Sequence, residues 1–393
     1  MMFKLFMRAT LLVVLLSAGL SAVAAPALIP APPQLQASGW ILMDAATGTV
    51  LAEHNADEAL PPASLVKIMT DYILAVELAA GRISLDDEVL ISEKAWRQGG
   101  SKMFVHVGDR VRVEDIARGI IIQSGNDASI AIAEFIAGSE DAFVQMMNAQ
   151  AELLGMTNTH FRNATGWPDP EQYSSPRDQA ILAKRLIQDH PEHYAIYAER
   201  EFTYGRDFQT GAPIIQRNRN SLLWMDQSVD GVKTGHTEAA GYCLVASAQR
   251  DGMRLISVLM GSDSTRSRAR DSQALLRYGF RFFETRSLYA GLQQLERSAV
   301  WQGRDDEVSV GLAENVVLTL PRGRYDDLRA TMTLDPWLTA PIAEGADVGT
   351  LSVTLDGDEV FSAALIALAA VERAGFFKRV WHSLQMFFTR LFS

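Results

Sequence analysis

The spacing of apolar residues switches from strand-like to helical and back, and this switch constrains the fold more than any other feature. Residues 39–52 carry apolar runs on both sides of a turn-forming segment at 44–48, which predicts a β-hairpin. Residues 242–260 predict two further strands about an Asp251-Gly252 turn. Helical spacing covers 64–80, 113–136, 142–154, 177–188 and 266–283. Because strands and helices come in separate blocks, we expect an α+β fold in which the helices are largely segregated from a sheet.

The pattern changes again near residues 285–290. From 291 to 365 there is little helical period, and short alternating runs such as 316–321 and 349–357 predict a small β-rich domain. We therefore expect a first domain at 38–287, a β-rich domain at 288–368 and a terminal segment at 369–393. The Pro-rich residues 25–37 form a linker before the first domain.

The first 24 residues have the pattern of a secretory signal peptide. Lys4 and Arg8 supply positive charge, residues 9–20 are apolar, and Ala22-Val23-Ala24 is a small-residue cleavage site. The alternative is an uncleaved anchor, because no charged residue occurs from Ala9 to Ile29. The Ala-, Ser- and Gly-rich second half favours cleavage, so we expect an exported protein.

The C-terminal residues 373–393 predict a helix that lies on a membrane surface. They contain four cationic residues and no acidic one. Bulky apolar residues recur from 376 to 392 and span about 160° of a helical wheel. Such a helix is too short and too charged to cross a bilayer but suits anionic lipid. The alternative is a core helix packed on the body of the protein.

The charge of the chain excludes one class of partner. With 47 acidic and 36 basic residues the net charge is −11, and all the acidic residues lie in 25–372. An acidic body is a poor general binder of nucleic acid, since phosphate neutralisation needs clustered Lys and Arg. Cys243 is the single cysteine, which excludes an intramolecular disulfide, and its apolar surroundings predict a buried thiol. His190 and His193 flank a proline, and we expect no metal there and no cofactor.

Three short motifs carry the chemistry of the first domain: Ser64-Leu65-Val66-Lys67, Ser124-Gly125-Asn126 and Lys233-Thr234-Gly235. On a helix, positions 64 and 67 share one face, so the Lys67 amine reaches the Ser64 hydroxyl. A serine needs a base to act as a nucleophile, and a lysine is a base only when neutral. The helix dipole, burial and a second cation at Lys233 all favour the neutral amine.

The other motif residues fit the same acyl-transfer chemistry. The Ser124 hydroxyl can relay a proton to a leaving amine, and Asn126 can orient the lysine and a substrate amide. Gly235, on a predicted strand, leaves room for a peptide to pair with the strand edge. The backbone N–H groups of Ser64 and His236 can form an oxyanion hole.

The sequence resembles the serine penicillin-binding proteins and β-lactamases, which share these three motifs. Longer stretches are similar to the low-molecular-mass D-alanyl-D-alanine carboxypeptidases of the penicillin-binding protein 5/6 type. These are PPASLVKIMT (61–70), GIIIQSGNDASIAIAEFIAGS (119–139), NRNSLLW (218–224), VDGVKTGHTEAAGYCLVASA (229–248) and YGFRFFET (278–285). The resemblance covers nearly the whole chain after the signal segment.

The resemblance implies that Ser64 is acylated by a peptidoglycan stem peptide ending in D-Ala-D-Ala, with loss of the terminal D-alanine. It implies β-lactams as covalent inhibitors and a place on the periplasmic face of the inner membrane. By position, Lys67 is the acylation base, Ser124 and Asn126 complete the catalytic set, and Lys233 and Thr234 hold the substrate carboxylate. Arg219 and Arg268 match family arginines near the site, although both also fit ordinary exposed arginines.

Two segments depart from the family pattern. Residues 94–103 are shorter than the family's loop over the active site, and 205–213 resemble an insertion at the rim of the cleft. Both leave gating and substrate preference open.

Other functions fit the residues less well. A class A β-lactamase needs E-x-x-L-N between the second and third motifs, and residues 127–232 contain no such string. A bifunctional transpeptidase needs a longer chain, and a related endopeptidase lacks the β-rich domain and the amphipathic tail. An inactive scaffold has no need of a nucleophile and base.

Overall fold

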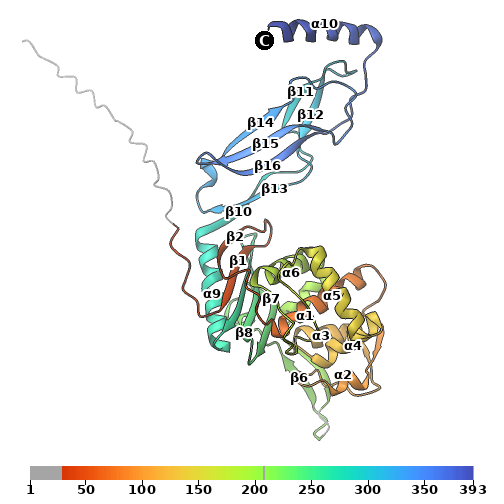
Figure 1. Cartoon of the computed structure of the whole chain (residues 1–393), viewed down its shortest axis with the longest axis vertical. Helices are drawn as coiled ribbons and strands as arrows, with labels where there is room; N and C mark the ends of the chain where they lie inside the picture. Colours follow the sequence, from red (N-terminus) through yellow and green to blue (C-terminus); the bar gives the residue numbers. More distant parts are fainter. Residues whose placement is uncertain (1–28, 207–208, 393) are drawn as a thin grey trace, which may run out of the picture.

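The computed structural model describes residues 29–206 and 209–392 (Figure 1). The predicted signal segment 1–24 lies outside these residues. Within the linker, residues 29–37 form no helix or strand and lie against the last helix of the first domain. There the Tyr278 hydroxyl donates to the Pro30 carbonyl at 3.1 Å.

A five-stranded antiparallel sheet forms the centre of the first domain. Its strands, in spatial order, are β2 (Val50–His54), β1 (Gly39–Asp44), β9 (Met253–Ser262), β8 (Gly241–Arg250) and β7 (Val229–Thr237). Along β1 the side chains alternate, so that Ile41 and Met43 enter one core while Trp40 and Leu42 enter another. Both faces of the sheet are therefore buried.

Helices cover the two faces unequally (Figure 1). The larger core lies under α1 (Val66–Ala79), α3 (Val113–Ile121), α4 (Asn126–Ala137), α5 (Glu140–Leu154) and α6 (Pro176–Asp189). The other face is covered by α9 (Thr265–Phe282), through Leu275 and Leu276. The α+β prediction is confirmed, and so are the hairpin at 39–52 and the two strands in 242–260.

Two predicted helices differ from the structure at functionally important points. The helix expected over 64–80 begins with a 3₁₀ turn, η1 (Ala63–Leu65), before α1. The helix expected over 113–136 is interrupted after α3, because Ser124 adopts a left-handed conformation with φ of 63°. That conformation breaks the helical hydrogen-bond ladder. The helical spacing of apolar residues continues across the break because α3 and α4 bury side chains in the same core.

Shorter elements complete the first domain. They are β3 (Glu88–Leu90), α2 (Glu93–Arg97), β4 (Arg110–Arg112), α7 (Pro191–Tyr194), η2 (Ala195–Ala198), β5 (Glu201–Arg206), β6 (Pro213–Arg217) and α8 (Leu222–Met225). Residues 205–213, the predicted insertion, form the tip of the β5–β6 hairpin; positions 207 and 208 lie outside the described residues. Gln216 on β6 donates to the Met103 carbonyl at 3.0 Å, which joins this hairpin to the short 94–103 segment.

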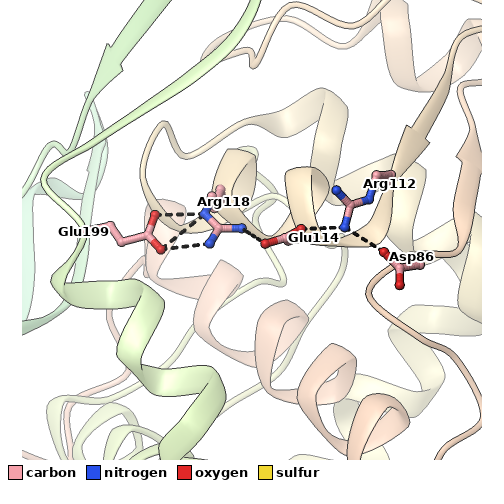
Figure 2. Close-up of polar contacts among 5 residues, drawn as sticks. All are labelled: Asp86, Arg112, Glu114, Arg118 and Glu199. Atoms are coloured by element: carbon pink, nitrogen blue, oxygen red, sulfur yellow. Dashed lines mark hydrogen bonds and ion pairs between the residues drawn. The ribbon is translucent and has the colours of Figure 1, made fainter.

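A chain of ion pairs ties α3 to its neighbours (Figure 2). Arg118 pairs with Glu114 at 2.8 Å and with Glu199 at 2.9 Å. Arg112 pairs with Glu114 and with Asp86, both at 2.7 Å. Pairs that are exposed or half-buried, as these are, add little stability one by one. Together they connect α3 to the segment before β3 and to the residue that follows η2, and α3 leads directly to Ser124.

The second domain is built of strands around its own core. Its strands are β10 (Phe283–Tyr289), β11 (Glu296–Ala299), β12 (Glu307–Gly311), β13 (Val316–Pro321), β14 (Arg329–Leu334), β15 (Asp347–Leu355) and β16 (Asp358–Ala367), with the turn η3 (Tyr325–Asp327). A five-stranded sheet has the order β11-β12-β16-β15-β14, and β10 pairs with β13. The apolar runs at 316–321 and 349–357 correspond to β13 and β15, as predicted.

The strand β10 begins at Phe283, before the expected domain boundary at 287, and hydrogen bonds join the turn after β1 to β10 and β13. The buried carboxylate of Asp44, at the end of β1, accepts from the Thr285 hydroxyl at 2.7 Å. The hydroxyls of Thr47 and Thr319 lie 2.8 Å apart. The turn between β1 and β2 is thereby fixed to both β10 and β13.

The predicted C-terminal helix is α10 (Phe376–Phe392), which lies beyond the far end of the second domain (Figure 1). Its polar side contacts that domain: Lys378 pairs with Asp306 at 2.7 Å, and His382 Nδ1 accepts from the Gln302 N–H at 2.9 Å. Its bulky apolar side chains are exposed, which contradicts the core-helix alternative. These are Phe376, Phe377, Val380, Trp381, Leu384, Phe387, Phe388 and Leu391. Over the described part of the chain, every helix is too short or too polar to cross a membrane.

Candidate active site

Ser64 and Lys67 lie together at the start of α1. Ser64 sits in η1, and Lys67 is in the first turn of α1 with no exposed surface. The Lys67 Nζ donates to the Ser64 Oγ at 3.3 Å and to the Asn126 Oδ1 at 2.7 Å. It also donates to the Thr165 carbonyl. A side chain with these contacts cannot swing away from the serine, so the geometry holds a base beside a nucleophile.

The surroundings of Lys67 favour its neutral form. Burial, followed by the positive charge of Arg219, lowers the pKa of Lys67 to about 7, although the carboxylate of Asp127 acts in the opposite direction. A substantial fraction of the amine is therefore unprotonated at neutral pH. Burial is the largest cause of the lowered pKa of Lys67, ahead of the neighbouring positive charge.

The second motif contributes from the break between α3 and α4. Asn126 is the first residue of α4; its Nδ2 donates to the Gly99 carbonyl and its backbone N–H to the Ser101 carbonyl, both at 2.7 Å. The short 94–103 segment thus holds the asparagine that holds Lys67. The Ser124 hydroxyl is buried and has no hydrogen-bond partner within the described part of the chain.

The third motif lies on β7, at the edge of the central sheet. Lys233 and Thr234 are buried, while His236 is exposed and packs on the Tyr242 ring at 4.0 Å. A Cβ on Gly235 would lie 3.2 Å from the Ser64 backbone nitrogen. A side chain at Gly235 would therefore require β7 or the 62–64 segment to shift by a few tenths of an ångström.

Four cationic side chains influence one another in this region. Burial, then Lys67, Arg219 and Arg268, holds the pKa of Lys233 well below its ordinary value, against the opposing charge of Asp71. Arg219 is exposed, yet its charge reaches both lysines. Arg268 is buried on α9, and its Nη1 donates to the Gly235 carbonyl at 2.9 Å. The structure brings both arginines to the site: the charge of Arg219 acts on both lysines, and Arg268 binds the Gly235 carbonyl of β7.

Other residues of the site belong to none of the three motifs. Thr165 supplies a carbonyl to Lys67, and a Cβ on the following Gly166 would overlap the Ala63 carbonyl. Asp127 accepts from the backbone N–H groups of Met103 and Phe104 at 2.9 and 3.1 Å. The one available signal for Asp127 was its position directly after the second motif.

The structure also shows the surroundings of two further residues singled out in the sequence, His193 and Cys243. His193 lies in the short helix α7 and is paired with Asp71. Among the residues that the structure describes, no cluster of three or more His, Cys, Asp or Glu side chains is arranged to hold a metal ion. Cys243 is fully buried on β8, and burial raises the pKa of its thiol to about 11.

Comparison with known proteins agrees with this geometry. The family model "D-alanyl-D-alanine carboxypeptidase" (Peptidase S11) matches residues 27–264, and "Penicillin-binding protein 5, C-terminal domain" matches 283–373. The D-alanyl-D-alanine carboxypeptidase DacC of Escherichia coli K12 is 46% identical over 368 residues, which are 92% of this chain and 90% of DacC.

Solved structures are similar as well. Penicillin-binding protein 5 from Haemophilus influenzae is 40% identical with a TM-score of 0.82, over 88% of this chain and 100% of that one. Penicillin-binding protein D2 from Listeria monocytogenes, solved in its ampicillin-bound form, is 29% identical with a TM-score of 0.57, over 63% of this chain and 100% of that one. The chain therefore belongs to the D-alanyl-D-alanine carboxypeptidase family, the serine peptidases of penicillin-binding protein 5/6 type.

Proposed function

We propose that this chain is a serine-type D-Ala-D-Ala carboxypeptidase that removes the terminal D-alanine from peptidoglycan stem pentapeptides. The observation that carries the proposal is the contact of the buried Lys67 amine with the Ser64 hydroxyl, in surroundings that favour a neutral amine. Family membership supports the substrate class, since DacC and DacA of Escherichia coli are D-alanyl-D-alanine carboxypeptidases.

The first half of the reaction acylates the serine. Lys67 takes the proton from the Ser64 Oγ, which attacks the carbonyl carbon of the penultimate D-alanine. Negative charge develops on the carbonyl oxygen, and the backbone N–H groups of Ser64 and His236 donate to it. When the peptide bond breaks, the leaving D-alanine takes up a proton, with the Ser124 hydroxyl as the relay. Lys233 and Thr234 hold the terminal carboxylate of the substrate.

The second half releases the shortened peptide. A water molecule attacks the ester on Ser64, and Lys67 again accepts the proton. The Asn126 Oδ1, at 2.7 Å from the Lys67 Nζ, keeps the amine directed at the reacting oxygen throughout. β-Lactams carry a carboxylate and a strained amide, so they enter the same steps as covalent inhibitors. The ampicillin-bound Listeria relative supports this part of the proposal.

The test is release of free D-alanine from a pentapeptide ending in D-Ala-D-Ala. The wild type should release D-alanine, and it should be labelled by fluorescent penicillin. Ser64→Ala should do neither while keeping the thermal unfolding midpoint of the wild type. A covalent penicillin adduct on Ser64→Ala would refute the role of Ser64. A wild type that takes up penicillin but releases no D-alanine would refute the carboxypeptidase.

We further propose that the protein is exported to the periplasm and lies on the inner membrane through residues 373–393. The polar side of α10 is engaged by the β-rich domain, and its apolar side is exposed. That orientation turns the aromatic side chains outward, where the lipid interface can accept them. The four cations of this segment suit anionic headgroups, whereas the acidic body is repelled by them.

Vesicle flotation tests this attachment. The full chain should float with vesicles that contain phosphatidylglycerol and float less with pure phosphatidylcholine. A chain lacking residues 373–393 should stay with the soluble fraction and keep its penicillin labelling. Truncated protein that still floats would refute the role of α10 and point to the N-terminal segment.

A further inference from the structure

A buried cluster of acid, histidine and tyrosine lies one helical turn beyond Lys67. Asp71 is on the same face of α1 as Lys67, four residues on, and has no exposed surface. Both of its carboxylate oxygens lie 2.9 Å from the His193 Nε2, and one accepts from the Tyr197 hydroxyl at 2.6 Å. The catalytic steps described above use none of these three residues.

The cluster reaches β7 through two tyrosine rings. Tyr194 and Tyr197 stack with their centroids 5.3 Å apart. A Cβ on Gly231 would lie 3.2 Å from the Tyr197 Cβ, so the ring pair packs directly on the strand that carries Lys233 two residues later. The Tyr194 hydroxyl donates to Asp230 at 2.9 Å on the same strand. The residues around Asp71 therefore bridge α1 and β7, which hold the two lysines.

The charges around Lys233 are strongly unbalanced. Lys67 on α1, Arg219 and Arg268 on α9 all repel its ammonium, and the carboxylate that acts in the opposite direction is Asp71. Asp127 has the corresponding part for Lys67. Asp127 is tied to backbone N–H groups, whereas Asp71 is tied to His193, which can itself carry a positive charge.

We propose that Asp71 is a positioning residue for carboxylate binding: its carboxylate, held by His193 and Tyr197 between α1 and β7, partly balances the cations that surround Lys233. The inference rests on the proposed function, in which Lys233 binds the terminal carboxylate of the substrate. Asp71 then contributes to substrate binding through Lys233, without itself contacting the substrate.

The sign of the pH dependence follows from these charges. The Lys233 ammonium is lost as pH rises, so carboxylate binding weakens on the alkaline side, and without Asp71 this loss comes at lower pH. His193 faces Asp71 and, more distantly, His190. When His193 is protonated it offsets the charge of Asp71, so Asp71 acts most strongly once His193 is neutral.

The test compares variants that do and do not remove the charge. In Asp71→Asn, the alkaline limb of kcat/KM for the pentapeptide should move down by about one pH unit, mainly through KM. At a pH above the alkaline limbs of both proteins, kcat/KM of Asp71→Asn should be about tenfold lower than that of the wild type. Tyr197→Phe removes a hydrogen bond from the same carboxylate without changing charge, and His193→Gln keeps an N–H donor. In each variant the other donor still holds the Asp71 carboxylate, so both should leave the alkaline limb where it is in the wild type.

Two further measurements separate the outcomes. If Asp71→Asn does not fold, the Asp71→Asn/His193→Gln double variant restores an amide pair and should show the same shift. A penicillin methyl ester, which lacks the carboxylate, should acylate the wild type and Asp71→Asn with equal pH dependence. An unshifted limb in the folded charge-removing variant, or an equal shift in Tyr197→Phe, would overturn the inference. A wild type that releases no D-alanine would instead overturn the proposed function.

Discussion

Gly166 packs directly against the backbone of Ala63 and Ser64, and adding a methyl group at Gly166 should impair catalysis. Gly166 has φ of 80°, and a Cβ at this position would overlap the Ala63 carbonyl and lie 2.9 Å from the Ser64 nitrogen. Restoring an ordinary carbon–oxygen contact requires the two segments to separate by more than ~1 Å. The same movement shifts Thr165, whose carbonyl accepts from Lys67.

The magnitude can be divided into two parts. An alanine in the left-handed region costs about 1–2 kcal/mol of stability wherever it occurs. A displacement of about 1 Å between reacting groups costs on the order of 100-fold in rate. Gly155 isolates the first part, because it has φ of 75° at the end of α5 and a Cβ there meets no atom within 4 Å.

The assay is the rate of acylation by fluorescent penicillin, beside the free energy of unfolding in urea. Gly155→Ala should lose about 1–2 kcal/mol and acylate at the wild-type rate. Gly166→Ala should lose more stability and acylate on the order of 100-fold more slowly. Acylation of a folded Gly166→Ala at the wild-type rate would show that the 165–166 segment does not set the position of Ser64 and Lys67.

Three other predictions concern separate parts of the molecule. Because the pKa of Lys67 is about 7 and the neutral amine is the base, the acylation rate should fall about fivefold from pH 7 to pH 6, measured by stopped flow; a rate that is flat over this range would exclude Lys67 as the base. Thr285→Val removes a donor to the buried Asp44 carboxylate and should lower the free energy of unfolding by about 1–3 kcal/mol in urea titration, whereas no change would mean that the domain junction adds nothing to stability. Cys243 should react with an aromatic disulfide reagent at pH 8 only after unfolding, since its buried thiol has a pKa of about 11; fast reaction of the native protein would contradict the burial.

The sequence was sufficient to predict elements whose signal is local. The turn at 44–48, the strands on either side of Asp251 and the helix at 266–283 all depend on spacing over a few residues, and the structure contains each of them. The first and third motifs were predictable for the same reason. Ser64 and Lys67 are three residues apart, and Lys233 follows a strand-like run.

Features that depend on distant contacts could not be predicted. Thr165 is 98 residues from Lys67, and His193 is 122 residues from Asp71, so no local period links either pair. The break at Ser124 was hidden because both flanking helices face one core, which keeps the apolar spacing continuous. In the sequence His193 is recognisable only as one of two histidines that flank a proline, because its partner Asp71 lies on another helix.

The position of β7 has a consequence for the solubility of the protein. A strand at the edge of a sheet presents unpaired N–H and C=O groups, which invite pairing with any extended chain, including another copy of the same protein. Such an edge cannot be closed by a permanent neighbouring strand if a peptide is to reach it. Here η1 and the residue before it lie against β7 at Gly235, where a Cβ would be 3.1 Å from the Pro62 carbonyl oxygen. In the described part of the chain β7 has one neighbouring strand, β8, so the feature that would let a peptide pair with β7 is also the one that favours pairing between copies.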